Sequence, residues 1–245
     1  MGALEGKTAL ITGASRGVGR EIALSFAAEG ASVAAAARTR EDIEVLCAEI
    51  TGAGGRAIPI WLDLRSEDSV RQAAAAATSA LGHIDILVNN AAVIALRKID
   101  ETSTAVWDEV MSTNVRGVFL MCREVLPHMC ERRSGRILNI GSMAGRRGYE
   151  QQGAYCASKH ALVGLTRVLA IETQPYGVRV HLLSPGGVLT GLSAELRASR
   201  GESQDSPDWM TTAEVARAAL YLCSQDGAAV TDELVLRRFP SEPWR

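Results

Sequence analysis

The chain has 245 residues, of which 47% are hydrophobic, enough for the core of one large α/β domain or of two small domains. Its formal net charge is −2 and no basic run exceeds a few residues, which argues against nucleic acid or an anionic membrane as the main partner. The five cysteines form an odd set without a C-x-x-C pair, and the four histidines show no ligand spacing, so neither a disulfide framework nor a metal site is predicted. The N-terminus lacks the pattern of a signal peptide and the apolar runs are too short to span a bilayer, so we expect a soluble, cytoplasmic protein.

Short apolar runs alternate along the chain with longer segments of helical composition. The predicted strands are Thr8–Thr12, Ser32–Ala36, Ile58–Leu62, Ile84–Asn89, Arg136–Ile140, Val178–Ser184 and Glu233–Arg237. The predicted helices are Arg20–Glu29, Arg40–Ile50, Glu67–Leu81, Ala105–Glu131, Ala154–Thr173 and Thr212–Ser224. Apolar strands separated by helices are typical of a parallel sheet that is covered on both faces. Because no linker or composition break divides the chain, we predict one α/β domain over residues 1–245, a doubly wound parallel sheet of about seven strands with helices on both faces.

The first predicted strand runs into a glycine-rich turn, TGASRGVGR, in which Gly13, Gly17 and Gly19 have the spacing G-x-x-x-G-x-G. Glycines at this place let the chain turn sharply and bring backbone N–H groups against a pyrophosphate at the N-terminus of the next helix. The spacing differs from the G-x-G-x-x-G fingerprint, and no Gly-Lys-Ser/Thr follows as in a P-loop. The pattern favours a dinucleotide-binding turn, and a plain turn between a strand and a helix is the alternative.

The second predicted strand ends in AAAARTR, without the acidic residue that NAD-binding folds place about 20 residues after the glycines. Arg38 stands where a ribose 2′-phosphate would be bound, and Arg16 in the glycine turn could approach the same phosphate. Because bonds from arginine to phosphate are strong and directional, the sequence favours NADP(H) over NAD(H). The alternative is that Arg38 only begins a solvated helix.

In the segment AYCASKHA, Tyr155 and Lys159 are four residues apart and share one face of a predicted helix. A free tyrosine, with a pKa of about 10, holds its proton too tightly to serve well as an acid near neutral pH. A nearby ammonium favours the phenolate, so we expect Lys159 to lower the pKa of Tyr155. The pair alone could arise by chance.

Taken together, the motifs resemble the classical short-chain dehydrogenase/reductase family, from Gly6 to about Thr190 and in the family's order. TGASRGVG is similar to the family's cofactor turn, NNAA to its N-N-A-G with Ala92 in place of glycine, and SPGGVLTG to its P-G segment. The core is similar to that of 3-oxoacyl-carrier-protein reductases and carbonyl reductases. The resemblance implies a Rossmann-type fold and an NADP(H)-dependent oxidoreductase that interconverts a ketone or aldehyde and an alcohol.

The resemblance also assigns roles to residues. Tyr155 would be the general acid/base, Lys159 would in addition bind the nicotinamide ribose, and Ser142 would hold the substrate oxygen. Asn114 would mark a helix break whose freed backbone group holds a water in a proton relay to the lysine. The residues assigned to cofactor binding are Gly13, Ser15, Arg16, Gly17, Val18, Gly19, Arg38, Thr39, Asp63, Leu64, Asn90, Ala91, Tyr155, Lys159, Pro185, Gly186, Val188 and Thr190.

Several features leave alternatives open. Arg146 and Arg147 could meet an acidic substrate, although a solvated loop is the favoured interpretation. Residues 187–210 include a polar stretch that indicates a substrate lid. The C-terminus lacks the V-D-G-G that is common in the family and is used in subunit packing, so a homodimer and a homotetramer both stay open. By position alone, the predicted substrate contacts are Val93, Leu96, Met143, Tyr149 and the segment 187–205.

The alternative function is a cofactor-binding protein without turnover, a redox sensor or a scaffold on the same fold. The complete set of Ser142, Tyr155 and Lys159 argues against it, because a protein without catalysis would not need all three.

Overall fold

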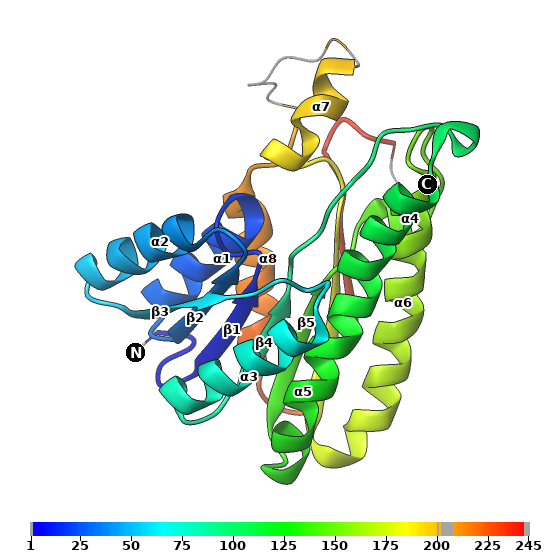
Figure 1. Cartoon of the computed structure of the whole chain (residues 1–245). Helices are drawn as coiled ribbons and strands as arrows, with labels where there is room; N and C mark the ends of the chain where they lie inside the picture. The colour runs from blue at the N-terminus through cyan, green and yellow to red at the C-terminus, as the bar shows by residue number, and fades with distance from the viewer. Residues whose placement is uncertain (1, 200, 202–207, 243–245) are drawn as a thin grey trace.

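The computed structural model describes residues 2–199, 201 and 208–242, and within them seven strands form one parallel sheet (Figure 1). The strand order is β3-β2-β1-β4-β5-β6-β7. The strands are β1 Thr8–Thr12, β2 Ser32–Ala37, β3 Arg56–Trp61, β4 Ile86–Asn89, β5 Gly135–Ile140, β6 Val178–Pro185 and β7 Glu233–Leu236. The predicted doubly wound sheet is confirmed, and no predicted strand end is displaced by more than two residues.

Helices cover both faces of the sheet (Figure 1). One face is packed by α1 Gly17–Ala28, α2 Arg40–Gly52 and α8 Thr212–Ser224. The other is packed by α3 Glu67–Leu81, α5 Gly117–Glu131 and α6 Gly153–Thr173. The two remaining α-helices of the described residues are α4 Thr104–Met111, just before α5, and α7 Gly191–Ser199, after β6.

The central strand β1 shows why the strands are apolar along their whole length. All five of its residues are buried, and neighbouring side chains point to opposite faces of the sheet. Leu10 packs in the core with Leu120 of α5, whereas Ile11 packs in the core with Val215 of α8. Burying one such side chain contributes roughly 1.5–3 kcal/mol, so both cores hold the strand in register.

The segment predicted as one helix, Ala105–Glu131, is α4 and α5 joined by a π-helical turn, Ser112–Arg116. At this wider turn the side chain of Asn114 bonds the backbone of a neighbouring loop. Its Oδ1 accepts from the Val93 N–H and its Nδ2 donates to the Val93 carbonyl, both at 2.9 Å. The predicted helical segment is therefore interrupted at Asn114, where the resemblance implies a break.

The predicted lid at 187–210 contains α7, which sequence patterns did not indicate. The ends of this segment are joined, since the Leu189 N–H donates to the Met210 carbonyl at 2.8 Å and the Met210 N–H donates to the Gly187 carbonyl at 3.1 Å. Trp209 is buried. Residue 200 and residues 202–207 of the predicted lid lie outside the described residues, and closure of this segment over a substrate stays a prediction.

The order of the strands places a crevice at the carboxyl ends of β1 and β4. The chain passes outward from β1 to β2 and β3, then crosses back to β4, so the loops that follow β1 and β4 diverge. Among the described residues, no helix is both long and apolar enough to cross a bilayer, and no group of three or more His, Cys, Asp or Glu could hold a metal ion. The five cysteines all carry free thiols.

Candidate active site

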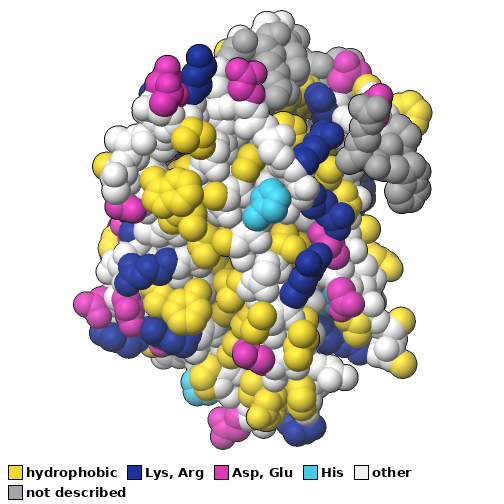
Figure 2. All heavy atoms as spheres, turned by 90° about the vertical axis from the view of Figure 1, so that its right-hand side faces the viewer, with side chains coloured by type: hydrophobic (Ala, Val, Ile, Leu, Met, Phe, Trp, Pro, Cys, Tyr) yellow, Lys and Arg dark blue, Asp and Glu magenta, His cyan; other side chains and the backbone are white. Residues whose placement is uncertain are grey.

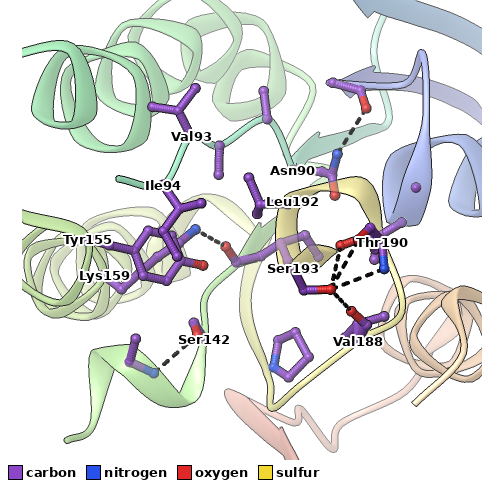
Figure 3. A pocket seen from close by; sticks show the side chains of 18 of the residues that line it. Asn90, Val93, Ile94, Ser142, Tyr155, Lys159, Val188, Thr190, Leu192 and Ser193 are labelled. Atoms are coloured by element: carbon purple, nitrogen blue, oxygen red, sulfur yellow. Dashed lines mark hydrogen bonds between the residues drawn. The ribbon is translucent and has the colours of Figure 1, made fainter. Parts of the chain in front are cut away.

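A cavity of about 420 Å³ opens at the carboxyl ends of the strands, and the loops after β1 to β6 contribute to its lining. It brings together the site residues predicted from the sequence, with two exceptions. Gly19 and Asn114 do not line it, and they lie directly behind residues that do. Figure 3 shows Tyr155 and Lys159 beside each other, with Ser142 next to them and Asn90 and Thr190 farther along the same cavity.

The glycine turn between β1 and α1 is a backbone cradle. Gly13 and Gly17 have φ angles of +68° and +59°, which residues with a side chain rarely adopt. A Cβ on Gly13 would stand 2.7 Å from the Ala91 Cα, and a Cβ on Gly19 would overlap the Gly13 carbonyl and the Asn90 amide. No side chain caps α1 at Arg16, so the first N–H groups of this helix remain for a ligand.

The amide of Asn90 joins this turn to the end of β4. Its Nδ2 donates to the carbonyls of Thr12 and Gly13 at 3.0 and 3.1 Å. The Thr12 hydroxyl in turn accepts from the backbone N–H groups of Asn90 and Ala91 at 3.1 and 3.2 Å. These bonds fix the two loops against each other and leave the backbone of both facing the cavity.

One end of the cavity is lined by Arg38 and Thr39 after β2 and by Asp63 and Leu64 after β3. Because the sequence predicts the nucleotide here, we call it the nucleotide end, and we call the opposite end the substrate end. Arg38 is exposed at the cavity edge. A hydrogen bond from Arg65 lowers the pKa of Asp63, and the charge of Arg38 adds a smaller effect in the same direction. Asp42 in the first turn of α2 also lines this end and was not predicted.

Tyr155 lies on the first turn of α6 and lines the cavity, with its side chain almost entirely buried. Burial raises its pKa to about 12, while a hydrogen bond with Ser142 acts in the opposite direction. The expected lowering by Lys159 is therefore wrong for the ligand-free protein, because desolvation of the phenolate outweighs any effect of the ammonium. The Ser142 Oγ also accepts from the Ala144 N–H at 3.1 Å, which fixes the side chain at the end of β5.

Lys159 is buried one turn after Tyr155. Its Nζ donates to the Ile140 carbonyl at 2.8 Å and stands 5.7 Å from the centroid of the Tyr155 ring. Burial lowers its pKa to about 8, so the ammonium form still predominates at neutral pH. A positive charge is thus held beside the phenol.

Asn114 acts on the site from behind. Its side chain holds Val93, which lines the cavity, and its Nδ2 also donates to the Ser158 Oγ at 3.0 Å. Ser158 in turn donates to the Tyr155 carbonyl at 2.8 Å. The residue positions the β4 loop and α6 relative to each other, and it does not itself face the cavity.

The substrate end agrees only partly with the sequence expectations. Val93, Met143 and Tyr149 line it as predicted, whereas Leu96 does not. The predicted segment 187–205 contributes Leu192 and Ser193, and Trp209 comes from the predicted lid. Sequence patterns gave no sign of six further residues: Ile94, Gln152, Arg237, Arg238, Ser241 and Glu242.

The comparison with protein families identifies a family. Residues 7–201 match the model described as short chain dehydrogenase. The D-threitol dehydrogenase of Mycolicibacterium smegmatis is 38% identical over 237 residues, which are 93% of this chain and 89% of that protein. A 3-oxoacyl-[acyl-carrier-protein] reductase of Thermotoga maritima is 33% identical over 236 residues, or 95% and 96% of the two chains.

Comparison with solved structures also finds short-chain oxidoreductases. A metagenomic short-chain oxidoreductase in complex with NADP has a TM-score of 0.84 at 31% identity, over 96% of this chain and 98% of that one. A putative NAD(P)-dependent gluconate 5-dehydrogenase of Beutenbergia cavernae with bound NADP has a TM-score of 0.86 at 36% identity, over 95% of each chain. The extent of these matches, together with the cavity at the switch point of the sheet, shows that the chain belongs to the short-chain dehydrogenase family.

Proposed function

We propose that the protein is a cytoplasmic, NADP(H)-dependent oxidoreductase that interconverts a ketone or aldehyde and an alcohol, with Tyr155 as the general acid/base. The observation that carries the proposal is the convergence of Ser142, Tyr155 and Lys159 at one end of a cavity whose other end is formed by the glycine turn and Arg38. The names of the relatives, a dehydrogenase and a reductase, support this reaction class.

The residues at the nucleotide end fit NADP(H). Gly13 and Gly19 lie where no Cβ can be placed without displacing its neighbours, which lets a pyrophosphate approach the backbone and the N-terminus of α1. Arg38 and Arg16 line this end and would supply guanidinium groups for a 2′-phosphate. NADP in the crystal structures of relatives supports the same choice. When bound, the nicotinamide would supply or accept the hydride.

Protein side chains would handle the proton. The hydroxyls of Ser142 and Tyr155 would both bond the substrate oxygen, and Tyr155 would donate its proton as the carbonyl becomes an alcohol. The raised pKa keeps Tyr155 protonated before reaction, and the Lys159 ammonium would stabilise the phenolate that forms when the proton leaves. In the alcohol-oxidising direction the phenolate would take the proton back. A water held at the π-helical turn near Asn114 would connect Lys159 to solvent.

We also propose a homodimer or a homotetramer. Figure 2 shows hydrophobic side chains spread over the face that carries α4 and α6. Trp107 of α4, Phe119 of α5 and Ile171 of α6 are exposed by 39%, 45% and 74%. An exposed apolar area of this kind supports contact with a second subunit. Light scattering during size-exclusion chromatography would separate the two assemblies from a monomer.

A panel of carbonyl compounds tests the function. Purified protein and NADPH are mixed with ketones, aldehydes, keto sugars and 3-oxoacyl thioesters, and the loss of NADPH absorbance is followed, with NADH in parallel. We expect turnover of at least one compound with NADPH and slower turnover with NADH. If NADPH binds and no compound in the panel is reduced, the sensor or scaffold is favoured instead.

A further inference from the structure

The loop between β5 and α6 carries two adjacent arginines in different surroundings. Arg146 turns away from the cavity and forms an ion pair with Glu233 of β7, with its Nη2 2.6 Å from Oε2. Arg147 lines the cavity. The structure therefore separates two residues that the sequence alone could not distinguish.

The position of Arg147 is fixed by Tyr149. The Arg147 Nε donates to the Tyr149 hydroxyl at 2.8 Å, and its guanidinium carbon lies 5.0 Å from the centroid of that ring. Its backbone N–H donates to the Met143 carbonyl at 3.2 Å. Tyr149 packs against the small hydrophobic cluster that contains Tyr155 and Cys156. Arg147 is exposed at the cavity edge, and its contacts with Tyr149 orient it there.

Most hydrogen-bonding capacity of this guanidinium is unused. Arginine has five N–H donors, and the Tyr149 hydroxyl takes one of them. Within the described residues, no Asp or Glu forms an ion pair with Arg147. The two Nη atoms can therefore bind an oxyanion in a bidentate manner, which is the strong geometry for carboxylate and phosphate.

The charges around the cavity favour an anion at this end. The lining residues described here include six cationic side chains and three carboxylates: Lys159, Arg16, Arg38, Arg147, Arg237, Arg238, Asp42, Asp63 and Glu242. Asp42 and Asp63 lie at the nucleotide end, and Asp63 is ion-paired with Arg65 at 2.7 Å. Phosphates of a bound nucleotide would engage the arginines of that end.

The other two arginines at the substrate end have structural contacts of their own. The Arg237 Nη1 donates to the carbonyls of Arg238, Phe239 and Ser241 at 2.6–3.0 Å, which folds the C-terminal segment. Arg238 lies over the Trp209 ring at 4.9 Å from its centroid. The contacts of Arg147 with Tyr149 orient it and use one of its five N–H donors.

We propose that Arg147 is a specificity-determining residue that binds an oxyanion of the substrate, so that the enzyme acts on carbonyl compounds or alcohols that carry a carboxylate or a phosphate. This inference rests on the proposed oxidoreductase function. It names the substrate class and leaves the chemistry at Tyr155 unchanged.

Matched substrate pairs test the inference. One arm compares oxo acids with their methyl esters, and a second compares phosphorylated with unphosphorylated hydroxyketones, each with NADPH. We expect at least one anionic compound to exceed its neutral partner in kcat/KM by roughly 10- to 100-fold, as for charge-assisted hydrogen bonds of about 1.5–3 kcal/mol. The arm that shows the preference identifies the anion.

Variants assign the preference to Arg147. Arg147→Gln should remove it, mainly by raising KM for the anionic compound, while the Kd of NADPH and the rate with the neutral partner stay within about twofold. Arg147→Lys should restore part of it, and Tyr149→Phe, which removes the orienting hydroxyl, should lose part of it. Arg146→Gln is the matched control and should keep the full preference.

Two results would overturn the inference while leaving the proposed function intact. The wild type could reduce both members of every pair equally well, or Arg147→Gln could keep the preference. Absence of turnover with every member of both arms, while another compound of the wider panel is reduced, would also overturn the inference alone. Absence of turnover with the whole panel would overturn the proposed function and this inference together.

Discussion

The nucleotide end and the substrate end of the cavity are built in different ways. At the nucleotide end the backbone itself forms the surface, in the turn from Gly13 to Gly19 and in the loop that Asn90 ties to it. At the substrate end the surface consists of side chains from distant segments, such as Val93, Tyr149 and Arg238. A backbone surface needs particular residue types at fixed spacing, whereas a side-chain surface can be assembled from many residues at many positions.

The proposed proton donor, Tyr155, lies at the end of the cavity opposite the glycine turn, and its loss should have the largest effect. Tyr155→Phe removes the acidic proton and keeps the ring, so turnover should fall by about 10²–10⁴-fold. The Kd of NADPH should change less than about twofold, because the packing at the nucleotide end is untouched. Steady-state kinetics and fluorescence titration measure both quantities. Tyr176→Phe, at an exposed tyrosine outside the cavity, is the control, and a Tyr155→Phe enzyme that retains wild-type turnover would place the proton donor elsewhere.

The backbone surface at the nucleotide end should tolerate no methyl group. Gly13→Ala forces a side chain into a φ of +68° and 2.7 Å from the Ala91 Cα, so we expect a loss of about 1–3 kcal/mol in the free energy of unfolding and weaker NADPH binding. Gly52→Ala, at the end of α2 with no atom within 4 Å of its Cβ, should cost nothing. Denaturant unfolding and titration compare the two variants. Equal stability and NADPH affinity in both variants would contradict the claim that the backbone of the glycine turn forms the cofactor-binding surface.

The choice between phosphorylated and unphosphorylated cofactor should depend on one side chain. Arg38→Gln should weaken NADPH binding by roughly 10- to 100-fold and leave NADH binding unchanged, since only the 2′-phosphate loses charge-assisted bonds. Arg40→Gln is the control, because Arg40 lies over the Trp61 ring at 5.9 Å and does not line the cavity. An equal loss for both cofactors would show that Arg38 acts on the fold and not on the phosphate.

The smallest expected effect is a pH dependence of stability in the ligand-free protein. Burial lowers the pKa of Lys159 from 10.5 to about 8, so just above pH 8 the unfolded chain binds more protons and stability rises with pH. Above pH 9.0 the buried thiols act in the opposite direction and stability falls, because burial raises the pKa of Cys47 from 9.0 to about 11 and the pKa values of Cys122 and Cys223 from 9.0 to about 12. Burial raises the pKa of Tyr155 from 10.0 to about 12, so stability falls with pH over that higher range. Lys159→Met should remove the rise and keep the fall. Urea unfolding across this pH range measures the free energy of unfolding of both proteins. If stability still rises with pH in the variant, the rise belongs to another group.

The sequence predicts the sheet well for a physical reason. Strands that are buried on both faces must be apolar along their whole length. In β1, for example, the neighbouring residues Leu10 and Ile11 pack into two different cores, so both must be apolar. The same holds for the glycine turn, where the close approach of Ala91 to Gly13 excludes a side chain. Motif order then points to Ser142, Tyr155 and Lys159, which the structure places in one cavity.

The other features of the site depend on tertiary packing, which no local sequence pattern predicts. A break at Asn114 is expected from the resemblance, but its bonds to the backbone of Val93, 21 residues away, are not. The direction of the Tyr155 pKa depends on how deeply α6 is buried, and the spacing from Lys159 could not reveal that. Arg146 and Arg147 are adjacent and identical in type, and their separate surroundings appear only when β7 lies beside the loop.

The most direct test of the central claim is isotope transfer from the cofactor to the substrate. NADPH carrying deuterium at one or the other C4 position is incubated with the best carbonyl compound of the panel, and the alcohol is examined by mass spectrometry. We predict one deuterium on the carbinol carbon from one of the two labelled cofactors, none from the other, and almost no product with Tyr155→Phe. An alcohol without deuterium from either cofactor would contradict hydride transfer and with it the proposed function.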